Sequence, residues 1–283
     1  MSRSTWRVLT RRPGRVVGLG ILLFFALLAV FGPSIYSGPL AIDPNDIYGS
    51  PSAQHWLGTD FAGSDIFREL VLGARYVLET AALSALFTVV IGTGVGLLAG
   101  YHRGATDSVL MRITDFVLTI PGLPLLIVLS TVWSFGRPLE MATALGVTGW
   151  GGVARAVRSQ TLSLRERGFL EAARGLGLSS RHVIVRELLP NLAPFVAMNM
   201  LLAVIAFIGA EVALFFLGVV PFSSSNWGVM LNQAVFSGGA MDSSAALSYL
   251  LSPLVCILLI TFGIVLFLDA VDELFNPRLR ERT

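Results

Sequence analysis

Long apolar runs dominate this chain, and their length decides which fold classes remain open. A helix needs about 20 mainly apolar residues to cross the hydrocarbon layer of a membrane. Five segments approach or exceed that length with at most one charged residue each: Val16–Pro33, Val77–Gly100, Ile113–Phe135, Leu192–Val220 and Ala245–Leu268. A shorter block rich in Gly and Thr, around Leu139–Ala154, is a sixth candidate. The sequence therefore predicts an all-α integral membrane protein with about six transmembrane helices.

The positions of the charged residues predict the orientation of these helices. Only 13% of the residues are charged, about half the share of a typical soluble protein, and no residue is a lysine. With six spans and the N-terminus inside, 17 of the 20 Lys and Arg positions, all of them arginine, are cytoplasmic, and Arg68, Arg75 and Arg137 lie outside. The positive-inside rule favours this distribution. We therefore expect both termini in the cytoplasm, and we expect no nucleic-acid partner despite the net charge of +2.

The spans divide the chain into three regions. Residues 1–76 hold a cytoplasmic N-terminal tail, the first transmembrane helix and an extracytoplasmic segment; residues 77–270 form a core with five helices; and residues 271–283 are a cytoplasmic tail. Within the core, residues 155–190 are the longest cytoplasmic stretch, and their pattern predicts a helix, a stop and a second helix ending at Pro190. The last outer loop, about Pro221–Ser244, is predicted to include a short re-entrant or interfacial helix.

Gly92, Gly96 and Gly100 recur every four residues within the second span. We interpret them as a small-xxx-small packing face rather than a nucleotide loop, because no strand precedes them. A Walker A loop needs a lysine, so the sequence predicts no nucleotide site. The lone Cys256 and three scattered histidines predict neither a disulfide nor a metal site, and we expect no cofactor on this chain. If transport is active, its energy must enter from another polypeptide.

One cytoplasmic segment carries a specific resemblance. Two runs, Glu171-Ala172-Ala173-Arg174-Gly175-Leu176-Gly177 and Glu187-Leu188-Leu189-Pro190-Asn191, resemble the EAA motif of ABC importer permeases. The resemblance implies a coupling helix that sits in a groove of an ATPase subunit. It assigns ATPase coupling to six residues: Glu171, Ala172, Ala173, Gly177, Leu189 and Pro190. Glu187 stands where close relatives usually have His.

Three further segments are similar to dipeptide, oligopeptide and nickel permeases. They are His55–Asp60 with Gly63, Asp65, Arg68 and Gly73–Arg75; Met111–Asp115 with Pro121 and Pro124; and Ala210–Gly218 with Pro221 and Ser225–Leu231. The ending Asn276–Arg280 also resembles the tail of that family. Together these segments identify the chain as similar to a C-type permease of this importer family, with the type I importer permease fold.

The resemblance implies a complete importer in the bacterial cytoplasmic membrane. Its expected partners are a homologous B-type permease, two ABC ATPase subunits that use ATP and Mg, an extracytoplasmic substrate-binding protein and membrane lipid. This chain would form half of a pathway for di- or oligopeptides and would not itself be an enzyme. Nickel complexes or oligosaccharides are alternative substrates. A secondary transporter is a less favoured alternative, because no internal repeat is visible.

Four residues outside the EAA segment are further candidates. Glu211 is a carboxylate within a span, which suggests a pathway or an outer gate, or else a hydrogen bond that holds helices together. Asp60, Asp65 and Arg68 are candidates for docking the binding protein, with stabilisation of their own loop as the alternative. Arg112 and Asp115 are predicted to form a local ion pair, with contact to the ATPase or to the B-type permease as the alternative.

Overall fold

The structure is a computed structural model that describes residues 12–36, 42–133, 135–220, 225–240 and 246–275, without the side chains of residues 174, 272, 274 and 275. The described part consists of helices and connecting loops, with two isolated β-bridges before α3. The predicted tail motif Asn276–Arg280 lies outside the described residues. The helices are α2 (Pro13–Ile35), α3 (Ile66–His102), α4 (Gly104–Thr119), α5 (Gly122–Ser130), α6 (Pro138–Gly149), α7 (Gly151–Arg165), α8 (Gly168–Gly175), α9 (Ser180–His182), η1 (Val183–Leu188), α10 (Leu189–Phe216), α11 (Trp227–Phe236) and α12 (Leu247–Phe275).

Four helices in the described part are long and apolar enough to cross a membrane: α2, α3, the continuous helix Ser180–Phe216, and Leu247–Val271 of α12. α4 and α5 together make a fifth candidate. The all-α membrane architecture is therefore confirmed, with four or five such spans where the sequence predicts about six. The predicted block Leu139–Ala154 is divided between α6 and α7, and neither meets the length of a span.

The predicted span Ile113–Phe135 is wrong as a single helix. α4 and α5 are bent by 75° relative to one another at a short break. Ile120 has an extended backbone, with φ −83° and ψ 122°, because the residue before a proline is disfavoured in the helical conformation. Pro121 also lacks the N–H that a continuing helix needs. The proline is therefore the physical reason for the break.

The predicted helix end at Pro190 is also wrong. The chain continues from α9 through η1 into α10 without a break. The turn before Pro190 is π-helical, and the N–H of Leu189 bonds to the carbonyl of Ile184, five residues back. The Asn191 side-chain amide donates to the carbonyl of Glu187, 2.7 Å away. A widened turn thus carries the helix past a residue that has no N–H.

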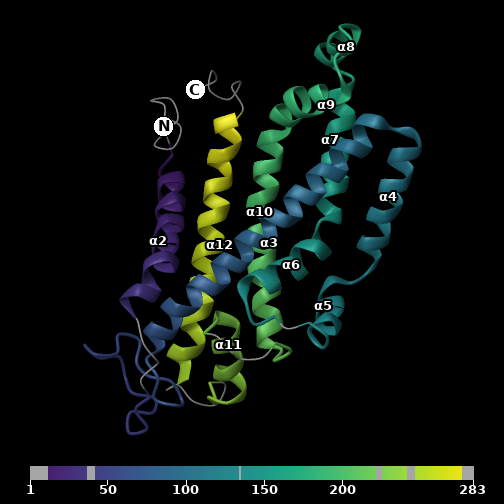
Figure 1. Cartoon of the computed structure of the whole chain (residues 1–283). Coiled ribbons are helices and arrows are strands. Elements are labelled where there is room, and N and C mark those ends of the chain that lie inside the picture. The colour runs from purple at the N-terminus through teal and green to yellow at the C-terminus, as the bar shows by residue number, and fades with distance from the viewer. Residues whose placement is uncertain (1–11, 37–41, 134, 221–224, 241–245, 276–283) are drawn as a thin grey trace.

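α3 is the central element of the bundle, and Figure 1 shows it crossing the other long helices diagonally. The predicted glycine face is confirmed, because it packs directly on α7. A Cβ built on Gly92 would lie 2.7 Å from Val153 Cβ, one on Gly96 2.6 Å from the carbonyl oxygen of Ala154, and one on Gly100 2.7 Å from Thr161 Cβ. Helices can approach this closely only where side chains are missing. The domain boundary predicted after residue 76 falls inside α3.

The bundle has two distinct ends. The α8 end holds α8, the start of α2 and the end of α12, and the α11 end holds α11 and residues 42–65 (Figure 1). α11 is the short helix predicted in the last outer loop, although Pro221 itself lies outside the described residues.

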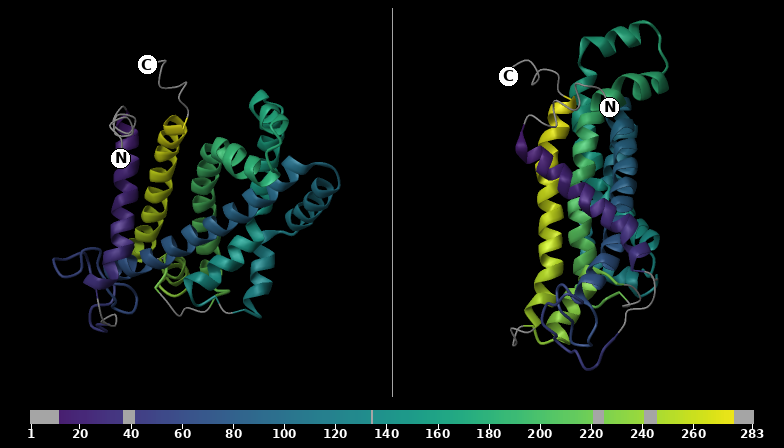
Figure 2. Two further views of the ribbon diagram at one scale, coloured as in Figure 1. Left: turned by 45° about the horizontal axis from the view of Figure 1, so that its top comes forward. Right: turned by 90° about the vertical axis from the view of Figure 1, so that its left-hand side faces the viewer.

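α2 packs on α12 and crosses it obliquely (Figure 2, right). The two helices approach closely at Gly18, where a Cβ would lie 2.9 Å from the carbonyl oxygen of Gly263. Arg15 Nη1 lies 2.6 Å from Glu273 Oε2, and these side chains are only 4% and 11% exposed. A buried ion pair, with no counterpart among the sequence predictions, therefore joins the first and last described helices.

Candidate functional site

The segment around Glu171 is a short helix that projects from the α8 end of the molecule (Figure 1). α8 is amphipathic: Leu170 and Ala173 are buried, whereas Glu171 and Ala172 are exposed. Leu176, just after the helix, is 79% exposed. α8 therefore has one face that packs on the protein and another that is open to a second molecule.

The turn after α8 depends on a glycine. Gly177 has φ +72°, a left-handed conformation that residues with a Cβ rarely adopt. The N–H of Leu178 bonds back to the carbonyl of Ala173 at 3.2 Å, which closes the helix end. Ser179 then caps α9, because its side-chain oxygen accepts a hydrogen bond from the N–H of His182. Gly177 thus reverses the chain between two helices.

The buried face of α8 is connected to the start of α10. Leu170 and Ala173 belong to the same apolar cluster as Leu188 of η1 and Leu192 of α10, with Leu189 packed against its edge. Pro190 is exposed. This cluster, hereafter the α8 cluster, also includes Leu97 and Tyr101 of α3, Val153 and Val157 of α7, and Val183. The EAA segment therefore contacts the ends of the two longest helices.

Ion pairs join α4 to α7 near the same end of the molecule. Asp107 of α4 receives two hydrogen bonds from Arg158 of α7, at 2.5 and 2.6 Å. This hydrogen bonding raises the pKa of the Arg158 guanidinium above its ordinary value. Asp115 pairs with Arg155 at 2.7 Å, and the predicted pair of Asp115 with Arg112 is not among the ion pairs of the described residues.

Glu211 lies in the half of α10 that is nearer the α11 end, and it is fully buried. Its Oε1 accepts a hydrogen bond from Asn226 Nδ2 at 2.7 Å, and Asn226 Oδ1 accepts from the N–H of Gly228 at 2.7 Å. The neighbouring Trp227 donates from Nε1 to the carbonyl of Leu70 at 2.9 Å. The structure thus places Glu211 in a contact that fixes the start of α11, and its role at a gate stays a prediction.

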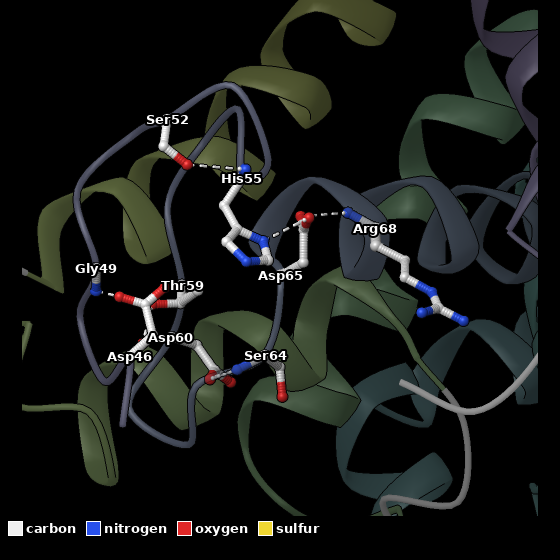
Figure 3. Close-up of polar contacts among 9 residues, drawn as sticks. All are labelled: Asp46, Gly49, Ser52, His55, Thr59, Asp60, Ser64, Asp65 and Arg68. Atoms are coloured by element: carbon white, nitrogen blue, oxygen red, sulfur yellow. Dashed lines mark hydrogen bonds and ion pairs between the residues drawn. The ribbon is translucent and has the colours of Figure 1, made fainter. Parts of the chain in front are cut away.

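Asp60 shapes the loop before α3 (Figure 3). Its Oδ1 accepts hydrogen bonds from the N–H of Ala62 at 2.9 Å and of Ser64 at 2.7 Å. Asp60 is only 2% exposed. It can therefore act on a docked protein only by holding the loop.

Asp65 caps the start of α3. Its Oδ1 accepts from the N–H of Arg68 at 3.1 Å, and its Oδ2 lies 3.0 Å from Nδ1 of His55. The Arg68 side chain extends away from these groups (Figure 3). The three docking candidates thus share one loop and helix start, with the two carboxylates engaged within it.

Comparison with known sequences decides the family. The family described as binding-protein-dependent transport system inner membrane component matches residues 92–281, about two thirds of the chain. This chain belongs to that family. A second family, the N-terminal TM domain of oligopeptide transport permease C, matches residues 1–52 of this permease.

Individual relatives extend over most of this permease. The dipeptide transport system permease protein DppC of Bacillus subtilis is 36% identical and covers 83% of this chain and 73% of its own. The oligopeptide transport system permease protein OppC of the same organism is 31% identical, covering 94% and 86%. The glutathione transport system permease protein GsiD of Pectobacterium atrosepticum is 30% identical, covering 98% and 93%.

Solved structures show the same fold. The permease resembles inward-facing conformations of the MetNI methionine ABC transporter in two crystal forms, with TM-scores of 0.57 and 0.54 at 22% and 21% identity. The matches cover 72% and 70% of this chain and 96% and 94% of the others. The predicted type I permease fold is thereby confirmed. The chain is a multi-pass inner-membrane ABC importer permease that works with other ABC subunits.

Sequence reasoning missed several residues of these contacts. Asn226 was not singled out, although it lies within the family-like segment Ser225–Leu231 and its amide could have been tested as a partner for Glu211. Neither the Arg158–Asp107 pair nor the Arg15–Glu273 pair has a local sequence signal, because their members lie 51 or more residues apart.

Proposed function

We propose that this chain is the C-type permease subunit of an importer for short peptides. It pairs with a homologous B-type permease, two ATPase subunits bind the α8 end, and a substrate-binding protein docks at the α11 end. In this arrangement the α8 end and both termini are cytoplasmic. ATP and Mg are used by the ATPase subunits, and this chain supplies half of the pathway and one coupling helix.

One observation carries the ATPase part of the proposal. Leu176 is 79% exposed beside a helix that projects from the bundle, away from the long apolar helices that would contact lipid (Figure 1). An exposed apolar side chain next to a structured amphipathic helix suits a protein interface. Glu171 and Ala172 on the same exposed face agree with the expected EAA contact.

The peptide substrate is supported by the relatives. Two of the similar permeases serve dipeptide and oligopeptide transport systems, and a third serves a system for glutathione, itself a small peptide. Nickel complexes and oligosaccharides remain the alternative substrates of this scaffold. Uptake of labelled dialanine into vesicles that contain the complete importer, with and without ATP, distinguishes these classes.

The coupling role is tested by replacing Leu176 with Asp. A carboxylate at this position should reduce co-purification of the ATPase subunits at least tenfold. Ile42→Asp is the matched control, because Ile42 is a similarly exposed aliphatic residue at the α11 end. Full retention of the ATPase subunits by Leu176→Asp, with folding intact, would refute the interface.

A further inference from the structure

Two oppositely charged side chains of α3 line an open cavity in the bundle. Arg75 and Glu79 are one helical turn apart, with 3.7 Å between Nε and Oε2, and they are 58% and 46% exposed. The cavity has a volume of about 530 Å³, and α2, α10 and α12 supply its other, apolar walls. The coupling, gate and docking candidates do not include either residue.

The depth of this cavity follows from the helices that form it. Leu201 and Val204 lie at the middle of α10, and Ile260 lies at the middle of α12. Both helices are long and apolar enough to cross a membrane, so their midpoints lie near the middle of the bilayer. Arg75, predicted from the sequence to lie outside, therefore lines a cavity that extends to mid-membrane depth.

Exposure of these charges to acyl chains is unfavourable. An ionisable side chain at this depth is costly, and such residues normally face the bundle interior or a water-filled cavity. A half-exposed pair at i and i+4 is too weak to offset that cost, since such pairs contribute little even on soluble helices. The face that carries Arg75 and Glu79 must therefore meet water, solute or protein in the assembled transporter.

The composition of the cavity indicates a solute. Small-molecule sites of this size have mostly apolar walls and a few polar groups that fix orientation. Here the polar groups are one guanidinium and one carboxylate, which complement a molecule that carries a carboxylate and an ammonium. A short peptide is such a molecule. A phospholipid would bring its phosphate to Arg75 but would have no ammonium held at mid-membrane depth for Glu79.

We propose that Arg75 and Glu79 line the translocation pathway and bind the carboxylate and ammonium ends of a short peptide at mid-membrane. This inference deepens the proposed function and rests on it for the identity of the solute. The two residues would bind the solute within the pathway, whereas the substrate-binding protein would select it before it enters.

The first test measures water access without any peptide. In a Cys256→Ser background, Glu79→Cys in the complete importer is treated with the cationic thiol reagent 2-(trimethylammonium)ethyl methanethiosulfonate. Leu258→Cys is the control, because Leu258 is 67% exposed on the apolar surface of α12. We expect Glu79→Cys to react at least ten times faster than the control. Its reaction rate should also change at least threefold when the ATPase subunits are trapped with vanadate. Equal rates would overturn the proposal, and protection of both sites would indicate lipid or the sister permease instead.

The second test measures import of dialanine. Arg75→Gln and Glu79→Gln should each lower the import rate at limiting dialanine at least tenfold, while assembly and ATPase activity stay within twofold. The double variant Arg75→Glu with Glu79→Arg keeps both charges in the cavity and should recover part of the rate. Leu258→Gln, on the exposed apolar surface of α12, is the control.

The outcomes separate the two proposals. Unchanged import by both single variants would overturn peptide binding by this pair, and loss of assembly would indicate a contact with the sister permease. If the wild-type importer does not take up dialanine, the proposed substrate is wrong, and the labelling rates still decide whether Glu79 lines a water-filled pathway.

Discussion

The contact between α3 and α7 provides a sharp test of the packing argument. A Cβ at Gly96 would lie 2.6 Å from the carbonyl oxygen of Ala154, 2.8 Å from Val157 Cβ and 2.9 Å from the backbone nitrogen of Arg158. Two of these atoms belong to the backbone of α7, so no rotamer change relieves the clash. With an ordinary contact distance of about 3.5 Å, Gly96→Ala requires the helices to separate locally by about 0.9 Å.

The magnitude follows from overpacking and from helix propensity. Forcing an extra carbon into a packed contact typically costs about 1–3 kcal/mol. Replacing Gly by Ala within a helix also contributes about 1 kcal/mol of stability, which partly hides that cost. Gly94→Ala isolates the propensity effect, because Gly94 lies in the same helix and a Cβ there would meet no atom within 4 Å. The difference between the two variants should therefore be about 1–3 kcal/mol.

The assay is equilibrium unfolding of the purified transporter in mixed micelles, measured for the wild type, Gly94→Ala and Gly96→Ala. Gly96→Ala should unfold at a lower denaturant fraction than Gly94→Ala, with a folded-to-unfolded ratio about 5- to 150-fold smaller, which corresponds to the expected free-energy difference. A difference in unfolding free energy below about 0.5 kcal/mol would show that α3 and α7 do not pack through this face, and the reasoning would fail.

Three further changes test other contacts. Glu273→Gln removes the carboxylate from buried Arg15 and should lower the free energy of unfolding by about 3–5 kcal/mol, measured by the same titration. Asn226→Ala removes the hydrogen bond to buried Glu211 and should cost about 1–3 kcal/mol, with faster hydrogen exchange in α11 as the specific readout. Gly177→Ala strains a left-handed backbone by about 1 kcal/mol and should weaken ATPase stimulation without unfolding the bundle, as an ATPase assay with circular dichroism would show.

Local patterns predicted much of the fold. The apolar blocks predicted the long helices, because a membrane-crossing helix is recognised by its length and apolar composition. The glycine spacing in α3 identified the face that packs on α7. The helix and stop predicted within residues 155–190 correspond to α8 and to the left-handed Gly177 that follows it. Pro121 is itself a local signal for the break between α4 and α5. The apolar run continues through it, however, and predicted a single helix.

Other features depend on tertiary structure and had no signal in one sequence. Pro190 normally ends a helix, and only the π turn η1 before it, whose Leu188 packs in the α8 cluster, lets the helix continue into α10. Glu211 could be recognised as costly in a span, but its partner Asn226 lies in a loop 15 residues away whose path the sequence does not specify. Arg75 was predicted to lie outside the membrane because it precedes the apolar block of the second span. Its depth in the membrane depends instead on the tilt of α3, which one sequence does not specify.

The position of the α8 cluster determines what movement of α8 can do. α8 contacts η1 and α7, and the cluster that holds its Leu170 and Ala173 also contains Leu97 near the end of α3. A displacement of α8 is therefore passed to the two longest continuous helices rather than absorbed in a loop. α3 then runs diagonally from this cluster, past Arg75 and Glu79, to its cap at Asp65 (Figure 1). Because a packed helix moves as a rigid element, we infer that a push at α8 shifts both the cavity beside Arg75 and Glu79 and the loop before α3, and that this shared helix links ATP use to solute movement.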